Sequence, residues 1–585
     1  MGKRSRITNR LSDLALAKPL DAKSAKRLEK RGGGGRKVIL HLSLLLIALA
    51  SGCLMGSTVA PVGAWPLAWV ALAPLWVIVA SPALFASPAF PALFWGIGYH
   101  GLALWWITGI HPMTWMGVPW LASLVIALFC WFAATLWGAA LVVVWAVGMT
   151  LISRVAKLAS WSRVAIGVAL WCGLEAVWTA SPLCWTSLAY TQSPHNLAIL
   201  HLGQLSGFSA VAASVVVVNA LLAEAWINRQ AHRENSSPPH PLALLASNAY
   251  ALRACFANGN AKALRRFISP AYLGTAVGFL VCLHLLGLSL YNRPLPQPPT
   301  SAIQVGIIQG NVPNEIKLYP AGFRRAIEGY TTGYLSLADQ GVDAVLTPEG
   351  ALPFLWNQVV HSSLYSAIQE KGVVAWVGAF GKQGNRITNS LFTVTGTGVF
   401  SRYNKEKLVP LGEYIPFEQF LGGIVNRLSP LDAHQVAGQP HQVFDTPFGR
   451  AIVSICFESA FSEHFRYQAA AGGEFILSAS NDAHYSPTMP AQHQAQDVMR
   501  AIETDRWAVR ATNTGYSAII DPHGRVPWIS RLKTYELHAA TIYRRQTQTL
   551  YVRWGDWLTP LLLVLGVSAF LLNATGFGRQ GVGQQ

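Results

Sequence analysis

Residues 450–459 read Arg-Ala-Ile-Val-Ser-Ile-Cys-Phe-Glu-Ser, a strand-like apolar run that ends at Cys456. Short runs rich in β-branched residues are typical of buried strands. Cys456 is the only cysteine in the long polar stretch between the last two hydrophobic spans, and a helix-like segment follows it. A thiol held at the end of a buried strand is well placed to act as a nucleophile. The run therefore indicates an α/β domain with Cys456 as its candidate nucleophile.

Two other strand-end motifs offer partners for this thiol. Glu349 ends the Thr-Pro-Glu motif at 347–349, and Lys405 lies within Tyr-Asn-Lys-Glu-Lys at 403–407. A carboxylate, an ammonium and a thiol make a complete set for acyl transfer, because a base and a cation can activate the thiol. Lys407 competes with Lys405 for this role, since residues two apart on a strand share one face.

The composition is that of an integral membrane protein with at least one soluble domain. The chain has 585 residues, of which 52% are hydrophobic and 12% charged, and its mean hydropathy is +0.33. Apolar runs long enough to cross a bilayer are predicted at about 38–57, 65–83, 89–110, 117–147, 163–183, 196–227, 271–291 and 556–573.

The basic residues alternate along this membrane half and predict its orientation. Residues 1–37 hold twelve Lys/Arg against three acids, and the loops around 148–163 and 228–270 are also basic. Three intervening turns contain no Lys or Arg, namely 58–64, 111–116 and 184–195. Because cytoplasmic loops carry the excess of Lys and Arg, the N-terminal tail is expected inside the cell and residue 292 outside.

The formal net charge of +17 would suit a nucleic-acid partner, but its distribution argues against one. Residues 301–550 contain twenty basic and twenty acidic side chains, so the soluble part is neutral. The excess lies in the tail and the inner loops, where it sets orientation. No nucleic-acid partner is therefore predicted.

The domain organisation follows from these patterns. A basic cytoplasmic tail at 1–37 precedes a membrane domain of seven helices at 38–291 and a stiff Pro-rich linker at 292–300. Residues 301–550 are expected to form one extracytoplasmic α/β domain. An eighth transmembrane helix at 556–573 then leads to a cytoplasmic tail at 574–585.

Within 301–550, short apolar runs alternate with amphipathic segments. Strands are expected at 303–309, 344–347, 373–378, 390–394, 451–455, 474–480 and 517–521, and helices at 324–340, 362–371 and 491–508. No His/Cys cluster has metal-ligand spacing, and His484 and His493 are interpreted as polar packing residues. No metal is predicted.

Pro348-Glu349, Tyr403-Asn404-Lys405 and the Ile-Cys-Phe-Glu run at 455–458 resemble the Glu–Lys–Cys signature of the nitrilase superfamily, with its carbon-nitrogen hydrolase-like domain. More narrowly, residues 403–416 resemble apolipoprotein N-acyltransferases. So do three shorter motifs, at 480–483, 492–493 and 500–503. The resemblance covers nearly everything after residue 38, and the order of seven spans, α/β domain and one span is itself specific.

The resemblance implies an αββα sandwich attached to a multi-span helical membrane domain. It implies an enzyme without a cofactor that takes a fatty acyl chain from a phospholipid and passes it, through a thioester on Cys456, to an amine. The acceptor would be the N-terminal amine of the diacylglyceryl cysteine of an apolipoprotein. The expected location is the bacterial cell inner membrane, as a multi-pass protein whose catalytic domain faces the periplasm.

The three motif residues receive roles on chemical grounds. Glu349 is expected to accept the thiol proton, because a free cysteine is mostly protonated at neutral pH. Lys405 would stabilise the thiolate and later the oxyanion, together with the backbone N–H of Phe457. Cys456 is the nucleophile, which implies ping-pong kinetics.

By resemblance, Glu413 is expected to hold Lys405 in register, and Glu458 to orient Lys405 or the loop that carries the thiol. The chain also departs from the family pattern at three places. Phe457 stands where a tyrosine is common, Leu318 where a tryptophan is often found, and His484 replaces another aromatic residue.

Two other readings of the chain stay open at this point. A membrane-anchored amidase or nitrilase would use the same three residues to hydrolyse a C–N bond, and a transporter or lipid-binding scaffold would carry an inert outer domain. Glu175 lies inside the fifth span and is interpreted as structural support rather than chemistry. Segments 351–356 and 416–440 are candidate cleft walls or lids.

Overall fold

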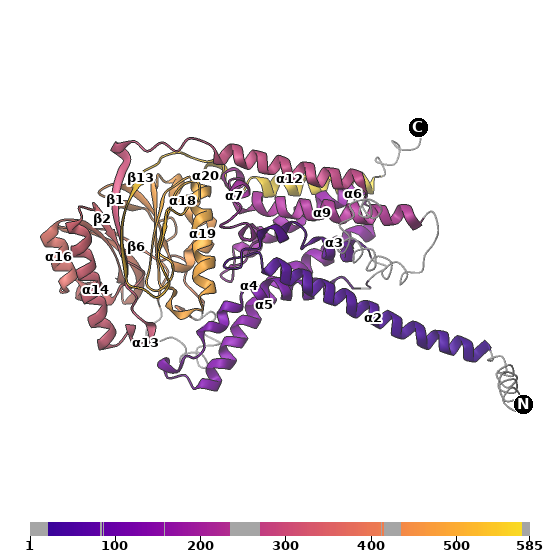
Figure 1. The fold of residues 1–585 in the computed structure, drawn as a ribbon, viewed down its shortest axis with the longest axis horizontal. Helices are drawn as coiled ribbons and strands as arrows, with labels where there is room; N and C mark the ends of the chain where they lie inside the picture. Colours follow the sequence, from indigo (N-terminus) through magenta and orange to yellow (C-terminus); the bar gives the residue numbers. More distant parts are fainter. Residues whose placement is uncertain are drawn as a thin grey trace, which may run out of the picture.

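The computed structural model describes residues 22–81, 85, 87–156, 158–234, 269–410, 412–414 and 435–575, with the side chains of 22–37 and 230–234 left out. Most of the candidate lid at 416–440 lies outside these residues, as do most of both predicted tails. The described chain forms a helical half and a sandwich of sheets and helices that lie side by side (Figure 1).

The helical half contains long apolar helices that pack against one another. Its main helices are α2 (Ala22–Gly56), α4 (Ala89–Ala103), α5 (Trp120–Val155), α6 (Ser160–Thr179), α9 (Phe208–Glu234), α12 (Pro270–Tyr291) and α21 (Leu558–Ala574). Helix α4 packs between α2 and α5, and α21 returns from the sandwich to pack on α6. These apolar helices are those of a membrane protein.

Among the described residues, four helical segments are long and apolar enough to cross a bilayer: Val38–Gly56, Trp120–Val155, Phe208–Arg229 and Pro270–Tyr291. Three further apolar segments are shorter, namely Trp65–Ala80, Leu197–Ser206 and Leu558–Ala574. The described part of the chain therefore contains four helices that are long and apolar enough to cross a bilayer, whereas the sequence contains eight apolar runs.

Three of the apolar runs predicted to span the bilayer contain breaks, which corrects the prediction of one continuous helix in each. The run 65–83 folds as a 3₁₀ turn (Trp65–Trp69) and a helix of 8 residues, α3 (Ala73–Ala80). Each begins with a proline in its first turn, where a missing N–H costs nothing. The run 89–110 is helical only to Ala103, and a second 3₁₀ turn, Trp105–Ile110, follows.

The run 196–227 also breaks, into α7 (Leu197–Leu200), α8 (Gly203–Ser206) and α9. The break before α9 lies at Gly207, whose φ of +70° favours glycine over other residues. A Cβ placed there would lie 2.5 Å from Cε2 of the Tyr551 ring, so the position requires glycine on both counts.

The sandwich contains two sheets. The first has the order β13-β1-β2-β4-β5-β6, with β3 (Leu352–Leu355) paired to β4. Its strands are β1 (Ala302–Gln309), β2 (Ala344–Leu346), β4 (Val374–Gln383), β5 (Arg386–Thr395), β6 (Gly398–Asn404) and β13 (Glu536–Tyr543). Strands β1, β2 and β4 run parallel, and β13 pairs antiparallel with β1.

The second sheet has the order β12-β11-β10-β9-β8-β7. Its strands are β7 (Phe444–Thr446), β8 (Gly449–Ile455), β9 (Phe475–Ser480), β10 (Ala508–Thr512), β11 (Ala518–Ile520) and β12 (Trp528–Ile529). Strands β8, β9 and β10 are parallel. In β8, Val453 and Ile455 face the core between the sheets whereas Ile452 faces the opposite side, as the two-residue period of a strand requires.

Helices cover both outer faces, which confirms the αββα arrangement. Helices α14 (Pro320–Asp339) and α16 (Ser363–Lys371) pack on the first sheet, and α18 (Ser462–Ala470) and α19 (Thr488–Thr504) pack on the second. The α18/α19 layer lies between the second sheet and the helical half (Figure 1). Its side chains share one hydrophobic core with the apolar helices.

The helix expected at 491–508 ends earlier than predicted. Asp505 adopts a left-handed φ of +57°, which terminates α19 at Thr504. The next residues cross to strand β10, where Val509 joins the core between the sheets. The apolar pattern of the sequence continues past Thr504 because helix α19 and strand β10 both bury apolar side chains.

Candidate active site

Three strand ends bring the predicted residues to one place. Glu349 follows β2, Lys405 follows β6 directly, and Cys456 follows β8. The first two come from one sheet and the thiol from the other. All three side chains line a single cavity of about 160 Å³, and Trp115 from the helical half also lines it.

Lys405 lies between two carboxylates. Its Nζ is 2.9 Å from Oε1 of Glu349 and 2.9 Å from Oε1 of Glu413, and its side chain is 1% exposed. Glu413 also accepts a hydrogen bond from the backbone N–H of Val409 through Oε2. A buried ammonium shared by two carboxylates is well fixed in space, because removing either partner would leave a buried charge uncompensated. Glu413 therefore contacts Lys405 directly.

Three further residues complete this cluster, of which Asn481 belongs to the 480–483 motif while Asn389 and Lys317 were missed from the sequence. Asn389 on β5 donates to Oε1 of Glu349 (2.8 Å), and the backbone N–H of Asn481 donates to Oε2 (2.9 Å). Buried Lys317 donates to the backbone oxygen of Glu349 (3.3 Å), and burial lowers its pKa to about 8. These residues are far apart in sequence and match no spacing rule.

The electrostatics define the resting protonation state. Burial raises the pKa of the Cys456 thiol well above its usual value, and the Glu349 carboxylate adds to the rise. Burial also disfavours the charged form of Glu349, but the Lys405 ammonium offsets this and holds the pKa of Glu349 below its usual value. The two carboxylates raise the pKa of Lys405 against the effect of its own burial. The resting site thus combines a thiol, a carboxylate and an ammonium.

Cys456 opens a short 3₁₀ helix, Cys456–Ala460, with a φ of +52°. Left-handed backbone is rare for a residue with a side chain and persists only where the surroundings impose it. His493 on α19 supplies one such constraint, because its Nε2 lies 2.8 Å from the carbonyl oxygen of Cys456. Sequence reasoning treated His493 as isolated polar packing, but the structure places it against the backbone of the thiol residue.

The other nitrogen of His493 continues into a buried network. Nδ1 lies 3.0 Å from Oδ1 of Asp482, and Arg510 donates to Oδ2 of the same carboxylate (3.0 Å). One atom each of Cys456, Asp482 and His493 lie within 4.8 Å of one another, as metal ligands can. Because the carboxylate and the imidazole already have protein partners, the arrangement favours a hydrogen-bonded support over a metal centre.

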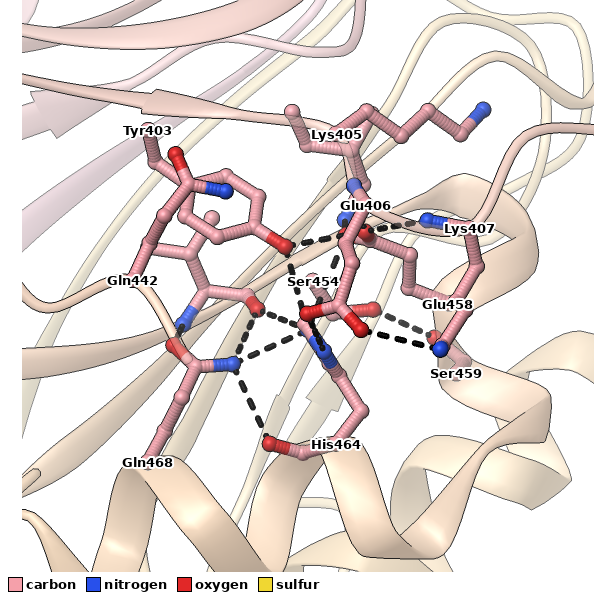
Figure 2. Close-up of polar contacts among 12 residues, drawn as sticks. Tyr403, Lys405, Glu406, Lys407, Gln442, Ser454, Glu458, Ser459, His464 and Gln468 are labelled. Atoms are coloured by element: carbon pink, nitrogen blue, oxygen red, sulfur yellow. Dashed lines mark hydrogen bonds and ion pairs between the residues drawn. The ribbon is translucent and has the colours of Figure 1, made fainter. Parts of the chain in front are cut away.

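Glu458 joins the two loops that carry Lys405 and Cys456. Its Oε1 accepts the backbone N–H groups of Glu406 (2.6 Å) and Lys407 (3.1 Å). Its Oε2 accepts the N–H of Ile455 (2.7 Å), and Tyr403 donates to Oε1 as well (2.9 Å). Figure 2 shows this carboxylate beside Tyr403, Glu406 and Lys407, while the Lys405 side chain points away from it. Glu458 therefore orients the loops and not the Lys405 ammonium.

The other residues singled out from the sequence lie near this site. Lys407 pairs with Glu406 (2.9 Å) and its side chain is 40% exposed, so it does not share the environment of Lys405. The Phe457 ring stacks on Trp185, with centroids 6.2 Å apart. Leu318 and His484 both line the cavity.

Two candidates lie away from the cavity. Buried Glu175 accepts the backbone N–H of Leu188 (2.9 Å), which ties two segments of the helical half together. Phe354 and Trp356 pack into the core beneath α14 rather than into the cavity wall, although Pro353 from the same segment does line it.

Comparisons with known proteins agree with this architecture. Residues 51–221 match the apolipoprotein N-acyltransferase N-terminal domain, and residues 313–550 match the carbon-nitrogen hydrolase family. An apolipoprotein N-acyltransferase from Nostoc sp. (strain PCC 7120) is 58% identical over 89% of this chain and 97% of its own length. One from Synechocystis sp. (strain PCC 6803) is 45% identical over 88% and 98%.

Among solved structures, an amidase of the nitrilase superfamily from Nesterenkonia AN1 aligns with 44% of this chain and 95% of its own, at 17% identity and a TM-score of 0.33. The two curated relatives, in contrast, extend over both the helical half and the sandwich. The chain belongs to the apolipoprotein N-acyltransferase family.

Proposed function

We propose that the protein transfers a fatty acyl chain from a phospholipid, through a thioester on Cys456, to the N-terminal amine of the diacylglyceryl cysteine of an apolipoprotein. The observation that carries this proposal is the cavity at the junction of the two halves, which Glu349, Lys405 and Cys456 line together. A lipid donor and a lipoprotein acceptor are the substrates that the name of the family implies.

In the first half-reaction, Glu349 takes the proton from Sγ of Cys456 and the thiolate attacks the ester carbonyl of the phospholipid. Lys405 and the backbone N–H of Phe457, which lies in the first turn of a 3₁₀ helix, stabilise the oxyanion. The C–O bond then breaks. The departing lysophospholipid takes the proton back from Glu349, and an acyl-thioester remains on Cys456.

In the second half-reaction, the unprotonated amine of the acceptor attacks the thioester carbonyl. Glu349 accepts a proton from the nitrogen, the C–S bond breaks, and an amide forms. The departing thiolate regains its proton from Glu349, so the resting site is restored. Lys405 serves both steps, because Glu413 keeps its ion pair with the ammonium while Glu349 carries the proton.

The helical half suits substrates whose chains stay in the bilayer. Extraction of an acyl chain into water would cost about 0.8 kcal/mol per CH₂, and a site at the membrane boundary avoids that cost. The alternation of basic loops supports a cytoplasmic N-terminus, a periplasmic sandwich and an inner-membrane location.

The main competing function is hydrolysis of a C–N bond by a membrane-anchored amidase. It uses the same three residues with water as the acceptor. The match of residues 51–221 to the N-terminal domain of the acyltransferases disfavours it, because a simple anchor needs no such domain. An inert scaffold, in turn, has no need of a buried Lys405 between two carboxylates.

The purified full-length protein, incubated with phospholipid, tests the proposal. Intact-mass measurement should show one fatty-acyl adduct, which peptide mapping places on Cys456. Addition of a synthetic diacylated lipopeptide should discharge the adduct and produce the triacylated peptide. An adduct that fails to form, or that passes only to water, contradicts acyl transfer and favours the amidase.

A further inference from the structure

The cavity lined by Glu349, Lys405 and Cys456 contains a second ammonium group, that of Lys317. Lys317 is only 7% exposed. Of the described residues that line the cavity, Lys317 and Lys405 alone carry an ammonium or guanidinium group. The proposed acyl transfer uses Lys405 and gives Lys317 no role.

The Lys317 ammonium has no carboxylate partner of its own in the described part of the chain. Glu349 and Glu413 both direct an oxygen to Lys405, each at 2.9 Å from its Nζ. Nζ of Lys317 makes one hydrogen bond to a described residue, to the backbone oxygen of Glu349 (3.3 Å). Because an ammonium carries three N–H donors, Lys317 can also donate to a ligand in the cavity.

Burial without an ion pair makes the charged form of Lys317 costly. The pKa of Lys317 falls to about 8, mainly because of burial, while the nearby Glu349 carboxylate opposes the fall. The side chain is still an ammonium at neutral pH. An anion that enters the cavity would offset this cost, since a buried charge is stabilised chiefly by a close partner of opposite sign.

The backbone that carries Lys317 is fixed on both sides of its helical turn, α13 (Asn314–Lys317). Before the turn, the Asn513 side chain accepts the N–H of Val312 (2.9 Å) and donates to its carbonyl oxygen (2.7 Å). After the turn, Gly322 packs so closely that a Cβ there would lie 2.7 Å from Cα of Lys317. The backbone of Lys317 is therefore held in place without a ligand.

The helical half contacts the segment that carries Lys317. Trp115, in the turn Thr114–Met116 between α4 and α5, lines the cavity. Its backbone oxygen accepts from the hydroxyl of Tyr319 (3.2 Å), two residues beyond Lys317. A lipid whose acyl chains lie along the apolar helices can therefore present its polar headgroup to this wall of the cavity.

The two proposed substrates differ in the charge that they would bring to Lys317. A phospholipid donor carries an anionic phosphodiester, which only the glycerol carbons and two ester oxygens separate from the reacting carbonyl. The acceptor brings an amine, which an ammonium does not attract. A buried ammonium beside the thiol thus matches the donor, because charge-assisted hydrogen bonds to phosphate are strong.

We propose that Lys317 binds the phosphodiester of the acyl donor and so makes the enzyme prefer phospholipids to esters that lack phosphate. The inference rests on the proposed acyl transfer and adds to it the residue that recognises the donor. Lys317 donates N–H groups to a phosphate oxygen while the ester carbonyl lies at Sγ of Cys456. No bond is made or broken at Lys317.

Two donors with the same acyl chains test this assignment on the purified full-length protein. Phosphatidylethanolamine carries the phosphodiester and diacylglycerol lacks it. Intact mass follows the Cys456 adduct over time without any acceptor, so an effect cannot come from the acceptor. Lys317→Gln is expected to lower the preference for the phospholipid, measured as the ratio of kcat/KM for adduct formation, about ten- to a hundred-fold.

Most of this loss should appear in KM, because the phosphate contact is present both before and during the reaction. Lys317 also helps to lower the pKa of Glu349, but that effect acts on both donors and cancels in the ratio. Lys317→Arg keeps the charge and should retain most of the preference. Lys382→Gln, at an exposed lysine of β4, is the matched control and should leave the preference unchanged.

An unchanged ratio in the Lys317→Gln protein, including equal losses with both donors, would overturn the proposal. Inorganic phosphate separates a lipid headgroup from a free anion. It should compete only weakly with phosphatidylethanolamine, since it lacks acyl chains. Complete inhibition by millimolar phosphate would assign the site to free anions and overturn the lipid assignment.

Lipid retention by the Cys456→Ala protein, measured by native mass spectrometry, does not require turnover. In that background Lys317→Gln should lower the retention of phosphatidylethanolamine relative to diacylglycerol, and an unchanged ratio would again contradict the proposal. The two measurements separate this inference from the proposed function. Selective retention without an adduct on the unsubstituted protein refutes only acyl transfer, whereas a normal adduct without a donor preference refutes only the role of Lys317.

Discussion

Burial and the neighbouring charges set the resting state of the candidate nucleophile, Cys456. Its thiol is buried and its pKa is raised, so at rest the thiol carries a proton. The Lys405 ammonium keeps the Glu349 carboxylate ionised despite its burial. At the scale of single residues, a neutral thiol and an ionised carboxylate therefore line the same cavity.

Replacement of Cys456 by Ser should abolish the acyl adduct and lower turnover by roughly a thousand-fold or more, because a hydroxyl is far harder to ionise than a thiol. Intact mass after incubation with phospholipid measures the adduct. Cys282→Ser, at an exposed cysteine of α12, is the control and should form the adduct normally. Normal turnover by the Cys456→Ser protein would contradict the nucleophile assignment.

The pH dependence of adduct formation should report the ionisation of Glu349. A base must be ionised, and its pKa lies below the ordinary value of 4.5. The active form therefore persists above that depressed pKa and is lost only as the pH falls through it. Quenched single-turnover rates should remain above half of their maximum at pH 4.5. An acid limb centred at a higher pH would contradict this prediction, provided that tryptophan fluorescence shows a folded protein.

At the scale of elements, the turn that carries the thiol is fixed from two sides. Glu458 accepts the N–H of Ile455 on one side, and His493 on α19 contacts the carbonyl of Cys456 on the other. Helix α19 also packs in the core shared with the helical half. The position of Cys456 is thus linked, through His493 and α19, to the junction between the two halves.

His493→Ala should slow adduct formation by roughly ten- to a hundred-fold with little change in KM, because a small displacement of the thiol spoils its alignment. His493→Gln should recover part of the rate, since its amide can still donate to the Cys456 carbonyl. Exposed His361 on the first-sheet side provides the control His361→Gln. Identical kinetics for the Ala and Gln variants would show that His493 does not position the turn through this hydrogen bond.

The break between α8 and α9 provides a stability prediction. Gly207→Ala should lower the free energy of unfolding by about 1–3 kcal/mol, because φ is +70° and the new Cβ would meet the Tyr551 ring at 2.5 Å. Gly274→Ala on α12 meets nothing within 4 Å and should leave stability unchanged or slightly raised. Thermal unfolding in detergent compares the two, and equal midpoints would contradict the account.

At the scale of the whole molecule, the apolar helices and the sandwich form one body, and the cavity lined by Glu349, Lys405 and Cys456 lies at their junction. The α18/α19 layer shares a core with the helices, so the sandwich is not simply tethered by the 292–300 linker. The orientation of this body in the membrane rests on the basic loops.

Cysteine labelling should test that orientation in a Cys282→Ser background. Gln340→Cys, at an exposed site beyond α14, should react with a membrane-impermeant maleimide in intact spheroplasts. Arg154→Cys, exposed at the end of α5, should react only after the cells are permeabilised. The reverse pattern would place the sandwich in the cytoplasm and contradict the proposed function.

The sequence by itself determined the membrane half, the alternation of strands and helices, and the ends of β2, β6 and β8 as the places for the reactive residues. These features depend on local periodicity and on side-chain type, which a linear chain displays directly. Strands β7 and β12, of 3 and 2 residues, are too short to show a period. Broken helices such as α7–α9 looked continuous because each piece is apolar.

Only the tertiary structure decided which side chains meet. Asn389 reaches Glu349 across 40 residues of chain, and His493 reaches the Cys456 carbonyl across 37. The Tyr-Asn-Lys resemblance already favoured Lys405 over Lys407, and the structure gives the physical difference, since Lys405 lies between two buried carboxylates and Lys407 does not. Contacts of this kind arise when two sheets and a helix layer pack together. Their geometry is a property of the packed core, and no local pattern in the chain encodes it.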